Sequence, residues 1–165
     1  NSDLANNYGN LCQRVTAFAI KNCDGKIPSE IKFLDEDLLI LDKYKKNLDN
    51  IRSKIDHQNI NFYIDYIVNS LFETNKYFND QEPWKKKDDQ IRLNTIVYTT
   101  LEIVRKISFM LYPIIPQSSI NALKIFSINE NDIKFSSLDN HNYLKKNDKI
   151  NQIDILFKKI EKTND

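Results

Sequence analysis

Apolar residues recur at intervals of three and four along most of the chain, the spacing that places them on one face of an α-helix. The pattern occurs in five segments, at about residues 4–19, 35–56, 59–78, 88–111 and 118–126. Gly25 and Pro28 close the first segment, Pro83 follows the third, and Pro113 to Pro116 separate the last two. Since short connections favour antiparallel neighbours, the sequence predicts an all-α fold, an antiparallel bundle of about five helices.

The third and fourth segments carry the strongest apolar patterns. We expect the third helix to be the more central one because it is the richer in bulky aromatic rings, namely Phe62, Tyr63, Tyr66, Phe72 and Tyr77. The fourth helix should present a wide apolar face made of Ile91, Ile96, Val97, Leu101, Val104 and Ile107.

The helical pattern ends near residue 128. Residues 129–151 are polar and aperiodic, and the apolar run from Ile153 to Phe157 is an isolated piece that could dock onto the bundle. We therefore predict a helical-bundle domain over residues 1–128 and a polar C-terminal extension over residues 129–165 that docks back on it.

Composition narrows the class of protein. The 165 residues are 41% hydrophobic, enough for one compact core, and two glycines and four prolines are too few for a many-stranded sandwich or barrel. A net charge of +1 gives no overall field that would draw the protein to a polyanion, so any nucleic-acid affinity must be local. The longest apolar run, near Ile107 to Tyr112, is too short to span a membrane, and no signal peptide opens the chain.

The two cysteines indicate a reducing compartment. Along one predicted helix Cys12 and Cys23 would lie roughly 16 Å apart, whereas a disulfide needs Cα atoms within about 7 Å. We expect both to be buried free thiols, which suits a cytoplasmic protein.

No catalytic or metal-binding constellation is visible. His57 and His141 lie in polar connecting segments without metal-ligand spacing, and Gly9 and Gly25 cannot form a phosphate-binding loop. Carboxylates on the second helix alternate with lysines, as on a solvated face. The sequence predicts no catalytic residue, no metal site and no cofactor in this chain.

A polar row distinguishes the first helix. Asn6, Asn10 and Arg14 recur at i, i+4 and i+8, opposite the apolar stripe, and their amide and guanidinium groups suit the edges of an unpaired base better than a phosphate. A polar face of this kind more often meets only water, and asparagine is common throughout the chain.

The only tryptophan lies in a polar segment, between Pro83 and a run of three lysines. Because proline restricts the residue before it, we expect Glu82 to be extended and Trp84 to be held at a stiff turn. The lysines lie either in the first turn of a helix that starts at Pro83 or in a loop before a helix that Asp88 or Asp89 caps. A ring beside lysines could stack an unpaired base, although most single tryptophans are partly buried anchors.

Four stretches together resemble the C-terminal anticodon-binding domain of methionyl-tRNA synthetase, a class I aminoacyl-tRNA synthetase. They are DLANNYGNLCQR at residues 3–14, KYFNDQEPW at 76–84, YPIIPQSS at 112–119 and LFKKIE at 156–161. Their order and spacing are those of the family, over essentially the whole chain. Lys85 and Lys86 replace the apolar and small residues that usually follow the Pro-Trp pair, and Lys158 and Lys159 depart from the usual ending.

The resemblance implies a function for the polar row and the tryptophan. Trp84 would stack on the wobble cytosine of the CAU anticodon, Asn10 and Arg14 would hydrogen-bond base edges, Asn6 would support them and Pro83 would position the ring. The partner implied is methionine tRNA, through its anticodon loop.

The motifs that bind ATP in class I synthetases are missing, so the resemblance implies a fragment that binds RNA and catalyses nothing. ATP, magnesium and methionine are expected in the enzyme's own catalytic domain, the second partner implied. Two alternatives remain: the anticodon domain of another class I synthetase, for isoleucine, valine, leucine or cysteine, and a helical protein-interaction module. A helical scaffold without a ligand would instead bury Trp84.

Overall fold

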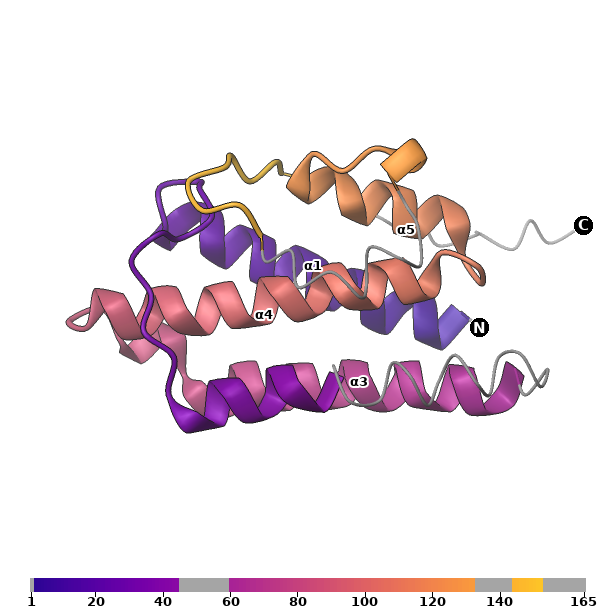
Figure 1. Cartoon of the computed structure of the whole chain (residues 1–165), viewed down its shortest axis with the longest axis horizontal. Helices are drawn as coiled ribbons and strands as arrows, with labels where there is room; N and C mark the ends of the chain where they lie inside the picture. Colours follow the sequence, from indigo (N-terminus) through magenta and orange to yellow (C-terminus); the bar gives the residue numbers. More distant parts are fainter. Residues whose placement is uncertain (1, 45–59, 133–143, 153–165) are drawn as a thin grey trace, which may run out of the picture.

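The computed structural model describes residues 2–44, 60–132 and 144–152, and it is an all-helical bundle (Figure 1). Within these ranges the only strand-like pairing is an isolated antiparallel bridge between Lys26 and Lys149. The all-α prediction is therefore confirmed.

The helices begin and end close to the predicted limits. One helix covers residues 35–44 of the predicted second segment, and the rest of that segment lies outside the described residues. The other elements are α1 (Ser2–Asn22), α3 (Ile60–Gln81), η1 (Pro83–Lys85), α4 (Gln90–Leu111), α5 (Pro116–Leu123), η2 (Lys124–Phe126) and η3 (Glu130–Asp132).

The central helix is α4, and the expectation that the third helix would be central is wrong. In Figure 1 α4 crosses the middle of the bundle with α3 below it and α5 above, and every residue from Thr95 to Leu111 is buried. α3 instead exposes part of its apolar surface, including 69% of Phe72. The first turn of α4 also departs from its predicted apolar face, because Ile91 is 48% exposed.

Polar residues can be buried on α4 because their hydroxyls bond within the helix. Thr95, Thr99 and Thr100 donate to carbonyl oxygens four residues earlier at 2.7–2.8 Å, and Ser108 donates to the Val104 carbonyl at 2.7 Å. Each hydroxyl is thus satisfied without water, which removes most of the cost of burying it. Aromatic content therefore does not identify the central helix, because residues with internally bonded hydroxyls can be buried as well.

An ion pair between a buried aspartate and a partly buried arginine links the helix over residues 35–44 to α4. Arg92 donates from its two terminal nitrogens to the carboxylate of Asp37, at 2.7 and 3.1 Å. The same carboxylate accepts from the Tyr77 hydroxyl and, at 2.8 Å, from the Leu34 amide. Burial opposes ionisation of Asp37, but these donors outweigh it and hold the pKa of the carboxyl below its ordinary value.

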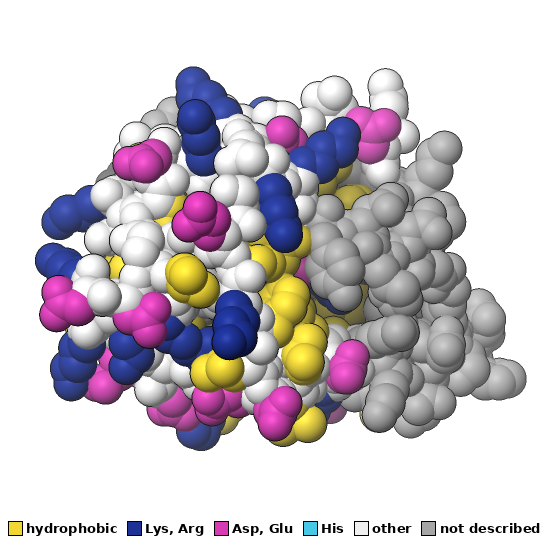
Figure 2. Space-filling view, turned by 60° about the vertical axis from the view of Figure 1, so that its left-hand side comes forward, with side chains coloured by type: hydrophobic (Ala, Val, Ile, Leu, Met, Phe, Trp, Pro, Cys, Tyr) yellow, Lys and Arg dark blue, Asp and Glu magenta, His cyan; other side chains and the backbone are white. Residues whose placement is uncertain are grey.

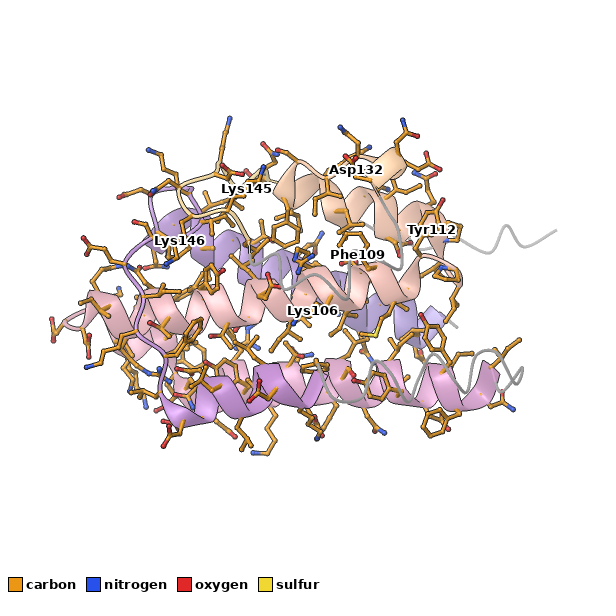
Figure 3. The ribbon with its side chains drawn as sticks, viewed as in Figure 1. Lys106, Phe109, Tyr112, Asp132, Lys145 and Lys146 are labelled. Carbon is orange, nitrogen blue, oxygen red and sulfur yellow. The ribbon has the colours of Figure 1, made fainter. Side chains whose placement is uncertain are left out.

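Residues 144–152 pack against α4 and the turn after α1. The Leu144 amide donates to Glu102 at 3.1 Å, and its carbonyl accepts from Tyr98 at 3.3 Å. Leu144 and Ile150 belong to the core, and the Ile27 amide donates to the Asp148 carbonyl at 2.8 Å. Figure 3 shows the segment that carries Lys145 and Lys146 on the same side of α4 as α5. The predicted docking run from Ile153 to Phe157 lies outside the described residues.

The surface mixes charged and apolar side chains. Figure 2 shows hydrophobic side chains gathered near the middle of one face, with basic and acidic side chains around them. No helix in the described ranges is both long and apolar enough to cross a bilayer.

Candidate nucleic-acid interface

The corner between α3 and α4 is formed by a residue with an uncommon backbone conformation. Glu82 has φ 47° and ψ 56°, the left-handed region, so the expectation of an extended Glu82 is wrong. The reason is that Glu82 immediately follows α3, where a left-handed residue commonly ends a helix. Pro83 then occupies the first position of η1, as expected for proline, and its side chain is buried.

The lysine run begins in η1 and continues into the connection between η1 and α4. Lys85 ends η1, Lys86 follows it, and α4 begins only at Gln90. Asp89 caps α4, since its carboxylate accepts from the Arg92 amide at 3.0 Å. The prediction that an aspartate caps a helix starting after the lysines is therefore confirmed for α4. The loop predicted for Lys85 is wrong, because Lys85 belongs to η1, which begins at Pro83.

Trp84 is fixed at this corner and still partly open to solvent. Its ring packs edge-on against Phe78, with the ring centres 6.0 Å apart and the planes at 63°. Phe78 is itself buried in the core. Trp84 nevertheless keeps 39% of its surface exposed, so the buried tryptophan expected of a scaffold without a ligand is not what the structure has.

Arg14 reaches this corner from α1. Its guanidinium lies over both rings, 5.0 Å from the centre of Phe78 and 5.6 Å from the centre of Trp84. It also donates to the side-chain oxygen of Asn79 at 2.5 Å. An arginine over an aromatic ring is worth about 0.5–1 kcal/mol at an exposed site, and the bond to Asn79 restricts how the planar group can turn.

The structure brings together some of the predicted site residues and not others. Arg14, Pro83 and Trp84 meet at the corner, whereas Asn10 and Asn6 lie one and two turns closer to the start of α1. Both asparagines are exposed. The opposite face of α1 is buried in the core, through Leu4, Tyr8, Leu11, Cys12, Val15 and Ala19.

Sequence reasoning missed the residues that hold the arginine and the tryptophan in place. Phe78 and Asn79 lie in the last turn of α3, and Phe18, one turn after Arg14, packs edge-on against Phe78 with ring centres 5.7 Å apart. One signal was present: an aromatic residue ends the third apolar segment just before the Pro-Trp pair.

The cysteines differ from expectation in one respect. Cys12 is buried, but Cys23 is only partly buried and lies in the turn that follows α1. Burial raises the pKa of the Cys12 thiol to about 12; burial, followed by the charge of Asp24, raises that of Cys23 to about 11. The described residues contain no group of three or more potential metal ligands, and both histidines lie outside them.

Solved structures share this fold. The free form of methionyl-tRNA synthetase from Mycobacterium tuberculosis superposes with a TM-score of 0.87 and 30% identity, over 96% of this chain and 32% of that one. The same synthetase bound to methionyl-adenylate gives a TM-score of 0.86. The fold is thus the helical bundle found in an aminoacyl-tRNA synthetase.

The sequence comparisons give the particular family. The family model described as the anticodon binding domain of methionyl tRNA ligase matches residues 27–165, and the chain belongs to this family. Methionine–tRNA ligase from Brucella suis is 37% identical over 139 residues, covering 84% of this chain. That from Thermotoga maritima is 34% identical over 163 residues, or 98% of the chain. The chain spans only 27% and 26% of the length of these two relatives.

Proposed function

We propose that this chain binds the anticodon loop of methionine tRNA and recognises its CAU anticodon. The family supports anticodon binding, and one structural relationship carries the assignment of residues: the guanidinium of Arg14 lies beside the partly exposed ring of Trp84. Bases in a single-stranded loop can be splayed out, stacked on an aromatic ring and hydrogen-bonded along their Watson–Crick edges.

In this proposal Trp84 is the stacking surface for the wobble cytosine. Stacking of a base on an aromatic side chain is worth about 1–3 kcal/mol. The buried Pro83 that precedes Trp84 in the chain and the contact of the ring with Phe78 hold the ring in one place before RNA binds. A ring that is already ordered loses little entropy on binding, so more of the stacking energy appears as affinity.

Arg14 and Asn10 supply the hydrogen bonds to the base edges, and Asn6 supports them. Cytosine presents two acceptors and one amino donor on its Watson–Crick edge. The five donors of a guanidinium suit the acceptors, and an asparagine carbonyl suits the amino group. Within the described residues, one Arg14 donor forms a hydrogen bond with the side-chain oxygen of Asn79, and this bond orients the remaining donors.

The rest of a longer protein would carry the chemistry. We propose that this domain belongs with a catalytic domain that holds ATP, magnesium and methionine and joins methionine to the tRNA in the cytoplasm. By itself the chain would bind RNA and catalyse nothing. Anticodon binding would favour the cognate tRNA by positioning its distant acceptor end.

Titration with RNA hairpins tests the proposal. Trp84 is the only tryptophan, so its fluorescence reports directly on the site. We expect an anticodon stem-loop carrying CAU to bind about tenfold or more tightly than one carrying GAU, because a well-made base contact discriminates by about 1–3 kcal/mol. Equal affinities would contradict recognition of the cytosine.

A pair of variants separates stacking from folding. Trp84→Ala should lose most of the affinity, and Trp84→Phe should keep part of it because a smaller ring still stacks. Both are measured by fluorescence anisotropy of labelled RNA, since neither variant contains tryptophan. Circular dichroism and urea unfolding of each variant show whether the bundle is intact. Unchanged affinity in a folded Trp84→Ala variant would remove the tryptophan from the site.

A further inference from the structure

The three consecutive lysines after Trp84 differ in their surroundings. Lys85 forms an ion pair with Glu82 at 2.8 Å, so its charge is partly offset. Lys86 is partly buried. Lys87 is exposed and borders a hollow that Trp84 also lines.

A second lysine reaches the same hollow from α1. Lys21 lies in the last turn of α1, where the helix dipole favours a cation. Within the described residues, neither Lys21 nor Lys87 forms an ion pair. Two lysines from distant parts of the chain therefore border one hollow, and neither has a carboxylate partner within the described residues.

The hollow is a preformed feature of the corner. Its volume is about 350 Å³, at the lower end of the ~300–1,000 Å³ typical of small-ligand sites. Ala17 and Phe18 provide apolar lining, and Phe18 is fixed by its edge-on contact with Phe78. The same hollow continues to the ring of Trp84 and to Asn22.

We propose that Lys21 and Lys87 bind the sugar-phosphate backbone of the nucleotide whose base stacks on Trp84. The inference rests on the proposed anticodon function, since it requires a base on Trp84. A nucleotide held there extends its ribose and phosphate beside the ring. The apolar lining contacts the ribose, and each ammonium group neutralises one of the two phosphates that flank that ribose.

The chemistry of lysine favours phosphate over a base edge. An ammonium is a compact charge on a flexible stem, whereas reading a base requires a fixed planar set of donors or acceptors. Contacts to phosphate position the nucleic acid without reading its sequence. Lys21 and Lys87 should therefore add the same binding free energy whatever the anticodon sequence, and this contribution should decrease as the salt concentration rises.

The experiment compares Lys21→Gln, Lys87→Gln, the double variant and the matched control Lys85→Gln. Binding of the CAU and GAU hairpins is followed by Trp84 fluorescence between 50 and 200 mM KCl. For single strands the slope of log affinity against log salt is about −0.7 per phosphate neutralised. We expect each single variant to make the slope shallower by about 0.7 and the double variant by about 1.4.

In Lys21→Gln, Lys87→Gln and the double variant, the affinity for the CAU hairpin and the affinity for the GAU hairpin should fall by the same factor. Lys85→Gln should leave the salt slope unchanged. Slopes equal to that of the unaltered chain would overturn this inference, while tight CAU binding that Trp84→Ala abolishes would leave the anticodon proposal standing. A loss confined to the CAU hairpin would also overturn it, since these lysines would then read a base. Failure of the unaltered chain to bind either hairpin would overturn both proposals.

Discussion

The guanidinium of Arg14 on α1 lies 5.6 Å from the centre of the Trp84 ring in η1. The same group lies 5.0 Å from the centre of Phe78 and donates to Asn79, both in the last turn of α3. One side chain thus contacts the end of a helix and the turn that follows it. This arrangement joins the polar row of α1 to the tryptophan.

Replacing Arg14 with lysine should weaken RNA binding although the charge is kept. Lysine has no planar fork and stacks poorly on rings, so we expect the affinity for the CAU hairpin to fall about tenfold, the equivalent of about 1.4 kcal/mol. Fluorescence titration measures the change. Lys76→Gln, an exposed substitution on α3, is the control for loss of a surface charge. Full affinity in Arg14→Lys would show that only the charge at this position matters.

The Asp37–Arg92 pair should make stability depend on pH. The pKa of Asp37 is lowered in the folded protein, because the bonds from Arg92 and Tyr77 outweigh the burial that would raise it. Its ionised form therefore stabilises the fold above the ordinary carboxyl pKa of about 4, and this contribution is lost as the pH falls through the lower folded-state value. Urea unfolding from pH 7 to pH 3 should show the loss.

Asp37→Asn provides the comparison. At pH 7 it should lower the free energy of unfolding by about 3 kcal/mol, because the partly buried Arg92 is left without its counter-charge. Below pH 4 the difference between the variant and the unaltered protein should narrow. A constant difference across this pH range would mean that another group causes the acid sensitivity.

Glu102 should determine whether residues 144–152 stay attached to α4. Its buried carboxylate accepts from the Leu144 amide at 3.1 Å and from Nε of Arg105 at 3.1 Å. Glu102→Ala should lower the free energy of unfolding by about 3–5 kcal/mol, because Arg105 and the Leu144 amide lose their buried acceptor. Hydrogen exchange at Leu144 should accelerate more than at Ile67 in α3. Equal acceleration at both would indicate a general loss of stability.

The cysteines should resist alkylation in the folded protein. Burial raises the pKa of Cys12 to about 12, and burial with the charge of Asp24 raises that of Cys23 to about 11, so little thiolate exists at pH 8. We expect Cys23 to react slowly and Cys12 only after unfolding, as mass spectrometry after iodoacetamide treatment would show. Rapid native modification of Cys12 would contradict its burial.

Substitutions at Glu82 should reveal the strain at the α3–α4 corner. Its left-handed backbone suits glycine and disfavours β-branched residues. Glu82→Val should lower the free energy of unfolding by about 1–3 kcal/mol, while Glu82→Gly should leave it unchanged or raise it slightly. Lys85→Gln removes the exposed ion pair alone and should change stability by less than about 1 kcal/mol. Equal effects of valine and glycine would argue against backbone strain.

The sequence by itself determined the helices and several of their ends. Helical hydrogen bonds join residues four apart, so a local apolar period and a local cap contain the necessary information. The aspartate cap of α4 and the preference of Pro83 for a first helical position could be predicted on this basis, whereas the choice between a helix and a loop for the lysines could not. The resemblance carried by short stretches likewise pointed to the family that the comparisons then gave.

Only the tertiary structure decided which helix is central and which side chains meet. Packing pairs residues far apart in sequence, and a local pattern does not specify how two helices cross. The contacts of Arg14 with Phe78 and Asn79, and the burial of Leu144 against α4, depend on such crossings. The left-handed Glu82 has the same origin, because the chain must end α3 and turn into η1 within one residue.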